Sequence, residues 1–132
     1  SSTLRRSRDT AKVIAARLNL RPVADPRLNE LHFGEWEGAL YRNLARTRSL
    51  EFRRWREGKL NRPPGGESVA SLRRRVGKFL KEMLERHPEE TVAVVSHGLA
   101  IALVRAHFGN YPVTRVWELI PQNCAPVEVE VG

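Results

Sequence analysis

The segment from Thr91 to Phe108 constrains the fold more than any other part of the sequence. Residues 91–96 form a short, β-branched apolar run, which is typical of a strand buried on both faces of a parallel sheet. The run passes through His97 and Gly98 directly into an apolar stretch that predicts a helix over residues 99–108, ending at Gly109. A strand that leads at once into a helix indicates an α/β fold.

Apolar residues at helical spacing predict three more helices, over about residues 4–19, 40–57 and 68–87. Ser68 is the expected N-cap of the third. A structured loop is predicted for residues 27–38, and the sequence Arg-Pro-Pro-Gly-Gly at 62–66 is a clear break. Near the end of the chain, valines at every second position from 127 to 131 predict a half-exposed strand.

These elements predict a three-layer α/β sandwich in which helices flank a mostly parallel central sheet. The length suits one domain over residues 1–132 with a single core. With a short extended stretch around Val23, about three strands are visible, too few for a well-covered sheet. We therefore expect the domain to be N-terminally incomplete, with its first strand outside this chain, and the start at Ser1 without a methionine agrees with that expectation.

The net charge of +8 lies entirely in the first half of the chain, where 15 basic residues face 7 acidic ones up to Arg62. A nucleic-acid surface, a field that attracts anionic substrates, and a general preference for arginine over lysine all fit this excess. Because no motif interleaves aromatic and basic residues, we expect no nucleic-acid partner.

Membrane insertion and disulfide chemistry are not indicated. No apolar run approaches the ~18 residues that a membrane span needs, so we expect no membrane partner. The single cysteine, Cys124, cannot form an internal disulfide, which fits a cytoplasmic location.

Three short segments carry residues suited to phosphate chemistry. Residues 2–11 place arginines at the opening turn of a helix, where free N–H groups and the helix dipole favour an anion. Residues 28–38 hold carboxylates among bulky apolar residues, where loss of water can keep a proton on a carboxyl group. His97 and Gly98 follow a predicted strand at the edge where open α/β sheets bind ligands. Taken singly, an arginine, a carboxylate or a histidine of this kind is more often a surface or structural residue.

Four motifs follow one another along the chain: Ser-x-Leu-x-Arg-x-x-x-Thr-Ala, Leu-x-Glu-x-x-Phe-Gly-x-Trp-Glu-Gly, Pro-Pro-Gly-Gly-Glu-Ser and Val-Ser-His-Gly. Together, and in this order, they resemble the histidine phosphatase superfamily, in particular its phosphoglycerate-mutase-like branch. The resemblance extends over essentially all 132 residues. It implies that Arg6, His97 and Gly98 bind phosphate. It also implies that His97 contacts the transferring phosphoryl group and that Glu30 protonates the leaving oxygen.

One family motif is absent from this chain. Members of the family carry an Arg-His-Gly motif at the end of their first strand, and its histidine is the nucleophile that becomes phosphorylated. No Arg-His-Gly occurs here, and His32, His87 and His107 match no catalytic position. The resemblance therefore implies a nucleophile upstream of this chain, and we expect little or no turnover from the 132 residues alone.

The function implied is hydrolysis of a small phosphorylated metabolite through a phosphohistidine intermediate, without a cofactor or a metal ion. The short connection from Gly38 to Pro63 favours a phosphatase, such as those that act on α-ribazole phosphate, over a mutase. Phosphoglycerate-mutase-type phosphoryl transfer, a non-catalytic phospho-ligand binder or scaffold, and nucleic-acid binding remain alternatives. The oligomeric state is open, and a homodimer is one possibility.

Overall fold

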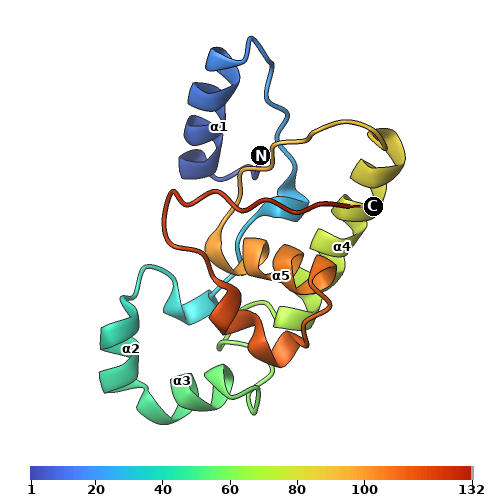
Figure 1. Cartoon of the computed structure of the whole chain (residues 1–132). Helices are drawn as coiled ribbons and strands as arrows, with labels where there is room; N and C mark the ends of the chain where they lie inside the picture. The colour runs from blue at the N-terminus through green and yellow to red at the C-terminus, as the bar shows by residue number, and fades with distance from the viewer. Residues whose placement is uncertain (132) are drawn as a thin grey trace.

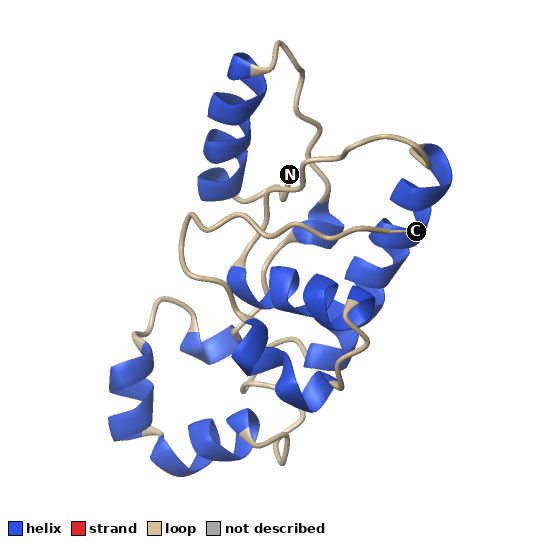
Figure 2. Ribbon diagram, viewed as in Figure 1, coloured by secondary structure: helices blue, strands red, loops and turns tan. Residues whose placement is uncertain are grey.

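The computed structural model describes residues 1–131, which form helices joined by loops (Figure 2). The α-helices are α1 (Arg5–Arg17), α2 (Tyr41–Thr47), α3 (Ser49–Arg56), α4 (Val69–Arg86) and α5 (Gly98–Phe108). Short 3₁₀ helices lie between them: η1 (Pro26–Leu28), η2 (Gly34–Trp36) and η3 (Val113–Leu119). Helices α4 and α5 occupy the middle of the molecule, with α1 at one end and α2 and α3 at the other (Figure 1).

Three of the predicted helices are confirmed, and their bounds as α1, α4 and α5 differ from the prediction by no more than two residues. The Ser68 hydroxyl accepts a hydrogen bond of 3.1 Å from the Ser71 N–H, so it caps α4 as expected. The helix predicted over residues 40–57 is wrong in one respect. It is interrupted at Arg48, where the backbone leaves the helical region, so α2 and α3 are separate helices.

The interruption at Arg48 allows both short helices to pack into one aromatic cluster. The helical spacing of apolar residues over 40–57 predicts that Tyr41, Leu44, Phe52 and Trp55 point inward. Leu44, Phe52 and Trp55 are buried, whereas Tyr41 is 52% exposed. The Trp55 ring meets the ring of Trp117 edge-on at a centroid distance of 4.6 Å. These contacts belong to the main hydrophobic cluster, which continues through the buried faces of α4 and α5 to η3.

The predicted three-layer sandwich is wrong for this chain, because residues 1–131 contain no β-strand and therefore no sheet (Figure 2). A strand is defined by hydrogen bonds to a neighbouring strand. Within the described part of the chain, the backbone of residues 91–96 makes a single backbone–backbone hydrogen bond, in which the Val95 carbonyl accepts from the Ser2 N–H at 3.0 Å. None of residues 91–96 is fully buried, contrary to the expectation for a central strand.

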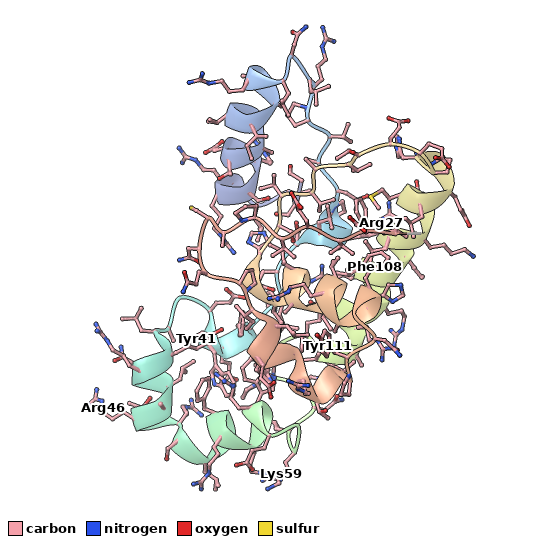
Figure 3. All side chains as sticks on the ribbon, viewed as in Figure 1. Arg27, Tyr41, Arg46, Lys59, Phe108 and Tyr111 are labelled. Atoms are coloured by element: carbon pink, nitrogen blue, oxygen red, sulfur yellow. The ribbon has the colours of Figure 1, made fainter. Side chains whose placement is uncertain are left out.

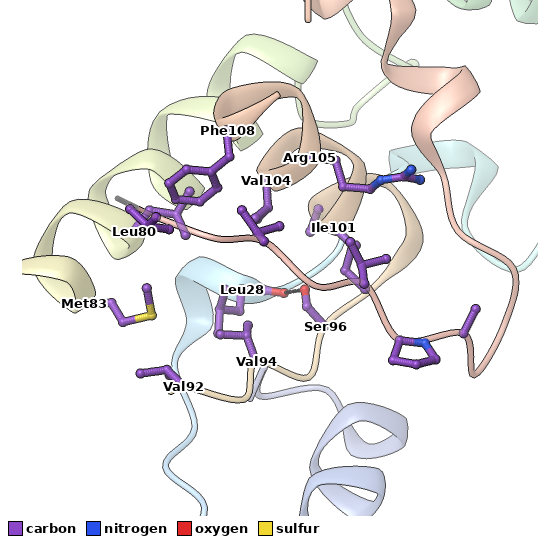
Figure 4. Close-up of a pocket in the computed structure, with 16 residues that line it drawn as sticks. Leu28, Leu80, Met83, Val92, Val94, Ser96, Ile101, Val104, Arg105 and Phe108 are labelled. Carbon is purple, nitrogen blue, oxygen red and sulfur yellow. Dashed lines mark hydrogen bonds between the residues drawn. The ribbon is translucent and has the colours of Figure 1, made fainter. Parts of the chain in front are cut away.

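The two segments predicted as strands instead line a common apolar cavity of about 230 Å³. Alternate residues of each segment contribute: 92, 94 and 96 from one, and 127, 129 and 131 from the other. Helices α4 and α5 supply the opposite wall with side chains such as Leu80 and Val104, and the Ser96 hydroxyl donates to the Leu28 carbonyl at 2.7 Å (Figure 4). Every second side chain of each segment thus faces the same way, as in a strand, but these side chains line a cavity and the two segments are not paired as strands.

The loop at residues 30–37 packs directly against the turn at residues 63–67. Gly34 has a φ of +57°, and a Cβ atom there would collide with the Pro64 carbonyl oxygen. A Cβ atom on Gly66 would lie 2.6 Å from the His32 carbonyl oxygen. The close approach allows the Glu35 N–H to donate to the Pro64 carbonyl at 2.9 Å and the Glu67 N–H to donate to the His32 carbonyl at 2.7 Å. Both glycines are therefore required for this contact.

None of the helices within residues 1–131 is both long and apolar enough to cross a membrane.

Substitution of two glycines by alanine should change stability in opposite directions. Gly34→Ala should lower the free energy of unfolding by at least about 2 kcal/mol, because it adds backbone strain and a collision with Pro64. Gly77→Ala, in the middle of α4 with open space at the Cβ position, should raise it by about 0.5–1 kcal/mol. Chemical denaturation of the whole protein measures both, and a Gly34→Ala variant as stable as wild type would contradict the packing described here.

Candidate phosphate-binding site

The candidate site is built around the first turn of α5. His97 is the N-cap residue of this helix, with extended backbone angles, and only 8% of its surface is exposed. Its Nε2 atom lies 2.7 Å from the hydroxyl of Ser2, a residue with no exposed surface. That hydroxyl also accepts from the Leu4 N–H at 3.2 Å, and it still has a proton to donate and a second lone pair for the imidazole. Which of the two groups donates in the Ser2–His97 hydrogen bond follows from which ring nitrogen of His97 carries the proton.

His97 is neutral at physiological pH. Burial of the imidazole, together with the positive charges of Arg6 and Arg75, lowers the pKa of His97 to about 4. The two arginines lie on α1 and α4, so one charged side chain from each helix acts on His97. A neutral imidazole surrounded by positive charge can donate a hydrogen bond to an anion and gains a proton more easily once the anion is present.

Glu30 reaches the same helix start from the loop after η1. Its Oε1 atom accepts from the Leu31 N–H at 2.9 Å, and its Oε2 atom accepts from the Leu99 N–H at 3.0 Å. A Cβ atom on Gly98 would lie 3.9 Å from Glu30 Oε2, an ordinary van der Waals distance, and 3.1 Å from Ile120 Cγ2, a tight contact. The small size of Gly98 therefore matters for packing against Ile120 and not for the approach of Glu30. The Glu30 carboxylate satisfies one of the free N–H groups at the beginning of α5, one residue beyond Gly98.

Arg6 lies in the first turn of α1, on the solvent side. The helix start is attached to the segment before α5, because the hydroxyl of Ser7 donates to the Val95 carbonyl at 2.8 Å and the Ser2 N–H donates to the same oxygen. Through this attachment the charge of Arg6 comes close enough to His97 to lower its pKa. Arg5, by contrast, is almost fully exposed beside Asp9, as expected for a solvated arginine.

Part of the basic excess of the first half is neutralised by local ion pairs away from this site. Arg27 of η1, labelled in Figure 3, pairs with Asp25 and with Glu82 near the C-terminal end of α4. Its closest N···O distances to the two carboxylates are 2.6 and 2.7 Å. The hydrogen bonds from Arg27 lower the pKa of Asp25 and of Glu82 below the usual values. Arg6 has no such carboxylate partner among the ion pairs of residues 1–131.

Glu30, His97 and Gly98 thus meet at the start of α5, and Arg6 acts on His97 through its charge. The apolar cavity beneath the segments at 91–96 and 127–131 lies elsewhere, and so does a second cavity between α3 and η3. No group of acidic, histidine or cysteine side chains suited to a metal ion occurs within residues 1–131. The roles of Arg6, Glu30, His97 and Gly98 in binding or catalysis remain predictions.

Two residues of this region could not be assigned a role from the sequence. Ser2 belongs to the first motif, but nothing in its spacing indicates that it bonds to a histidine 95 positions later. Arg75 is one of three consecutive arginines in α4, and the sequence does not distinguish it from Arg73 and Arg74. Only the placement of α4 beside η1 shows which of the three faces the site.

Two curated relatives resemble this chain closely. Phosphoserine phosphatase 1 of Hydrogenobacter thermophilus is 35% identical over 126 residues, an alignment that covers 95% of this chain and 60% of that protein. The probable phosphoglycerate mutase GpmB of Yersinia enterocolitica is 33% identical over 135 residues, covering 98% of this chain and 61% of that protein. The chain therefore spans about three fifths of the length of the relatives it matches.

Solved structures agree in fold. A mycobacterial glucosyl-3-phosphoglycerate phosphatase, determined in complex with inorganic phosphate, superposes with a TM-score of 0.74 at 31% identity, over 87% of this chain and 59% of that one. The family model of the histidine phosphatase superfamily, branch 1, matches residues 1–132. The resemblance seen in the sequence is thereby confirmed, and the chain belongs to the histidine phosphatase superfamily.

Proposed function

We propose that the whole protein hydrolyses the phosphoester bond of a small phosphorylated metabolite through a phosphohistidine intermediate. The observation that carries this proposal is the meeting of Glu30 with the buried, neutral His97 at the first turn of α5. The carboxyl group, the imidazole and the positive charge of Arg6 are the groups needed for proton donation and for phosphoryl binding. The names of the relatives support phosphoester chemistry, since two of those cited are phosphatases.

In the proposed reaction, a histidine outside these 132 residues attacks phosphorus and the substrate oxygen leaves. Glu30 gives its proton to that oxygen, while Arg6 and His97 hold the phosphoryl oxygens. Water then attacks the phosphohistidine and gives a proton to the Glu30 carboxylate, which releases inorganic phosphate and restores both the nucleophile and the acid. The protein contributes mainly by positioning the reacting groups and neutralising charge, and these two effects provide most of the rate acceleration in phosphoryl transfer.

Phosphoglycerate mutase activity is the second candidate, and the similarity to GpmB favours it. Residues 39–62, which connect the two halves of the described structure, hold only the short helices α2 and α3. We expect this compact connection to leave the site open to water, which favours hydrolysis over return of the phosphoryl group to the product.

A phosphohistidine should be detectable on the whole protein. After brief incubation with phosphoserine and a denaturing quench, mass spectrometry and an acid-lability assay should find phosphate on a histidine other than His97. His107→Gln, a substitution of an exposed histidine, should leave the labelling unchanged. A protein that accumulates no acid-labile phosphate with phosphoserine, 3-phosphoglycerate or 4-nitrophenyl phosphate would favour the non-catalytic phospho-ligand binder. Isomerisation of 3-phosphoglycerate in place of phosphate release would identify a mutase.

The buried His97 should make stability depend on pH in the acidic range. Because its pKa is about 4 in the folded protein and about 6.5 in the unfolded chain, only the unfolded state takes up the proton between these values. The free energy of unfolding should therefore fall as the pH drops from 6.5 to 4, by up to about 3 kcal/mol from this residue alone.

Chemical denaturation of wild type and of His97→Asn at a series of pH values measures this contribution as a difference in slope. The variant should lose less stability on acidification than wild type, whereas His107→Gln should follow wild type. Equal slopes for wild type and His97→Asn would mean that His97 is not held in the neutral form by its surroundings.

A further inference from the structure

Arg75 of α4 makes five hydrogen bonds, all to the region around the candidate acid. Its Nη1 atom donates to the carbonyl oxygens of Arg27 at 2.9 Å and Asn29 at 2.6 Å. Its Nη2 atom donates to the Glu30 carbonyl at 2.9 Å and to Glu67 Oε2 at 2.8 Å, and its Nε atom donates to Glu67 Oε1 at 2.9 Å. A guanidinium group has five N–H donors, so every donor of Arg75 is occupied.

Glu67 holds the guanidinium in this orientation. It binds Arg75 through both carboxylate oxygens, and the side chains of the pair are only 16% and 23% exposed. Burial alone would raise the pKa of Glu67, but the hydrogen bonds and charge of Arg75 outweigh it and keep the pKa below its usual value. The carboxylate is fixed in turn because Glu67 N–H donates to the His32 carbonyl across the contact made by Gly66.

These contacts determine the position of Glu30 from both sides. Arg75 donates to the carbonyl oxygens of Arg27 in η1, of Asn29 just after η1, and of Glu30 itself. The N–H groups of Leu31 and Leu99 hold the two oxygens of the Glu30 side chain. Main chain and carboxyl group are thus fixed relative to α5, although the loop itself has no regular secondary structure at residues 29–33.

We propose that Arg75, oriented by Glu67, is a positioning residue that fixes the carboxyl group of Glu30 for proton donation to the leaving oxygen. This inference rests on the proposed function of Glu30. With every donor occupied, Arg75 has none left for a phosphoryl oxygen, which separates its role from that expected for Arg6. The Pro-Pro-Gly-Gly-Glu-Ser segment takes part in this positioning, since it supplies both the contact made by Gly66 and the side chain of Glu67.

Dependence on the leaving group distinguishes positioning of an acid from general structural support. Departure of an alkoxide from glycerol 2-phosphate requires a proton, whereas 4-nitrophenolate leaves from 4-nitrophenyl phosphate with little help. The quantity to measure is the ratio of kcat/KM for the alkyl ester to kcat/KM for the aryl ester. The fraction of folded enzyme cancels in this ratio, so partial unfolding of a variant cannot change it.

The experiment compares the whole wild-type protein with Arg75→Lys, Arg75→Gln and Glu67→Gln. Arg74→Gln, a neighbouring exposed arginine on α4, is the matched control, and Glu30→Gln is the reference for loss of the acid. Lysine keeps the charge but cannot reproduce the fork of donors. We expect both Arg75 variants to lower the ratio by roughly 10- to 100-fold, and Glu30→Gln to lower it further. Arg74→Gln should keep the wild-type ratio.

Each other outcome has a defined meaning. If Arg75→Lys and Arg75→Gln leave the ratio at its wild-type value while Glu30→Gln lowers it, Arg75 is a structural residue and the inference is overturned. If Glu30→Gln also leaves the ratio unchanged, or if wild type hydrolyses neither ester, the proposed function fails instead.

Discussion

The Glu30 carboxylate accepts a hydrogen bond from the Leu99 N–H, and this contact joins two segments that lie 69 positions apart in the sequence. The beginning of an α-helix has free N–H groups that need acceptors. Here a side chain from a distant loop supplies one, directly beside the buried His97. Placement of the candidate acid and satisfaction of the helix start are therefore the same interaction. A change that displaces the loop would both leave a backbone donor without its acceptor and move the carboxyl group away from the imidazole.

The basic character of the chain also has a structural explanation that its composition could not provide. Arg27 and Arg75 are held in ion pairs by Asp25, Glu82 and Glu67, and Arg75 in addition binds backbone carbonyl oxygens. Their charges stabilise the loop around Glu30 and are already compensated. The charges of Arg6 and Arg75 both lower the pKa of His97, but Arg6 differs in that no carboxylate balances it among the ion pairs of the described residues. If the start of α5 binds an anion as proposed, Arg6 is the arginine near His97 whose charge no such pair compensates.

The sequence predicted local features well and long-range pairing poorly. Helices α4 and α5 could be predicted because each carries its own signals: the cap at Ser68, the stop at Gly109 and apolar residues at helical spacing. The sheet could not be predicted in this way, because a strand needs a neighbouring strand to pair with. In the described part of the chain, the one backbone–backbone hydrogen bond of residues 91–96 comes from the Ser2 N–H. The motifs brought Glu30 and His97 to attention, and the structure places both at α5. Arg75 was missed because its partners are mostly main-chain carbonyl groups, which leave no trace in the sequence.

The proposed reaction needs a nucleophile and an acid, and this chain determines the position of the acid but not that of the nucleophile. In the proposed reaction the nucleophile is a histidine outside these residues, and the chain covers about three fifths of the length of its relatives. The position of Glu30, the proposed acid, is determined within this chain, because its backbone donors, Arg75 and Glu67 all lie between residues 30 and 99. His97 is likewise fixed by Ser2, whose own position is set by Val95. Because these contacts are internal, the Glu30 carboxyl group and the His97 imidazole are oriented by the chain itself. In the proposed reaction this preorganisation would lower the barrier, since no binding energy would have to be used for ordering the loop.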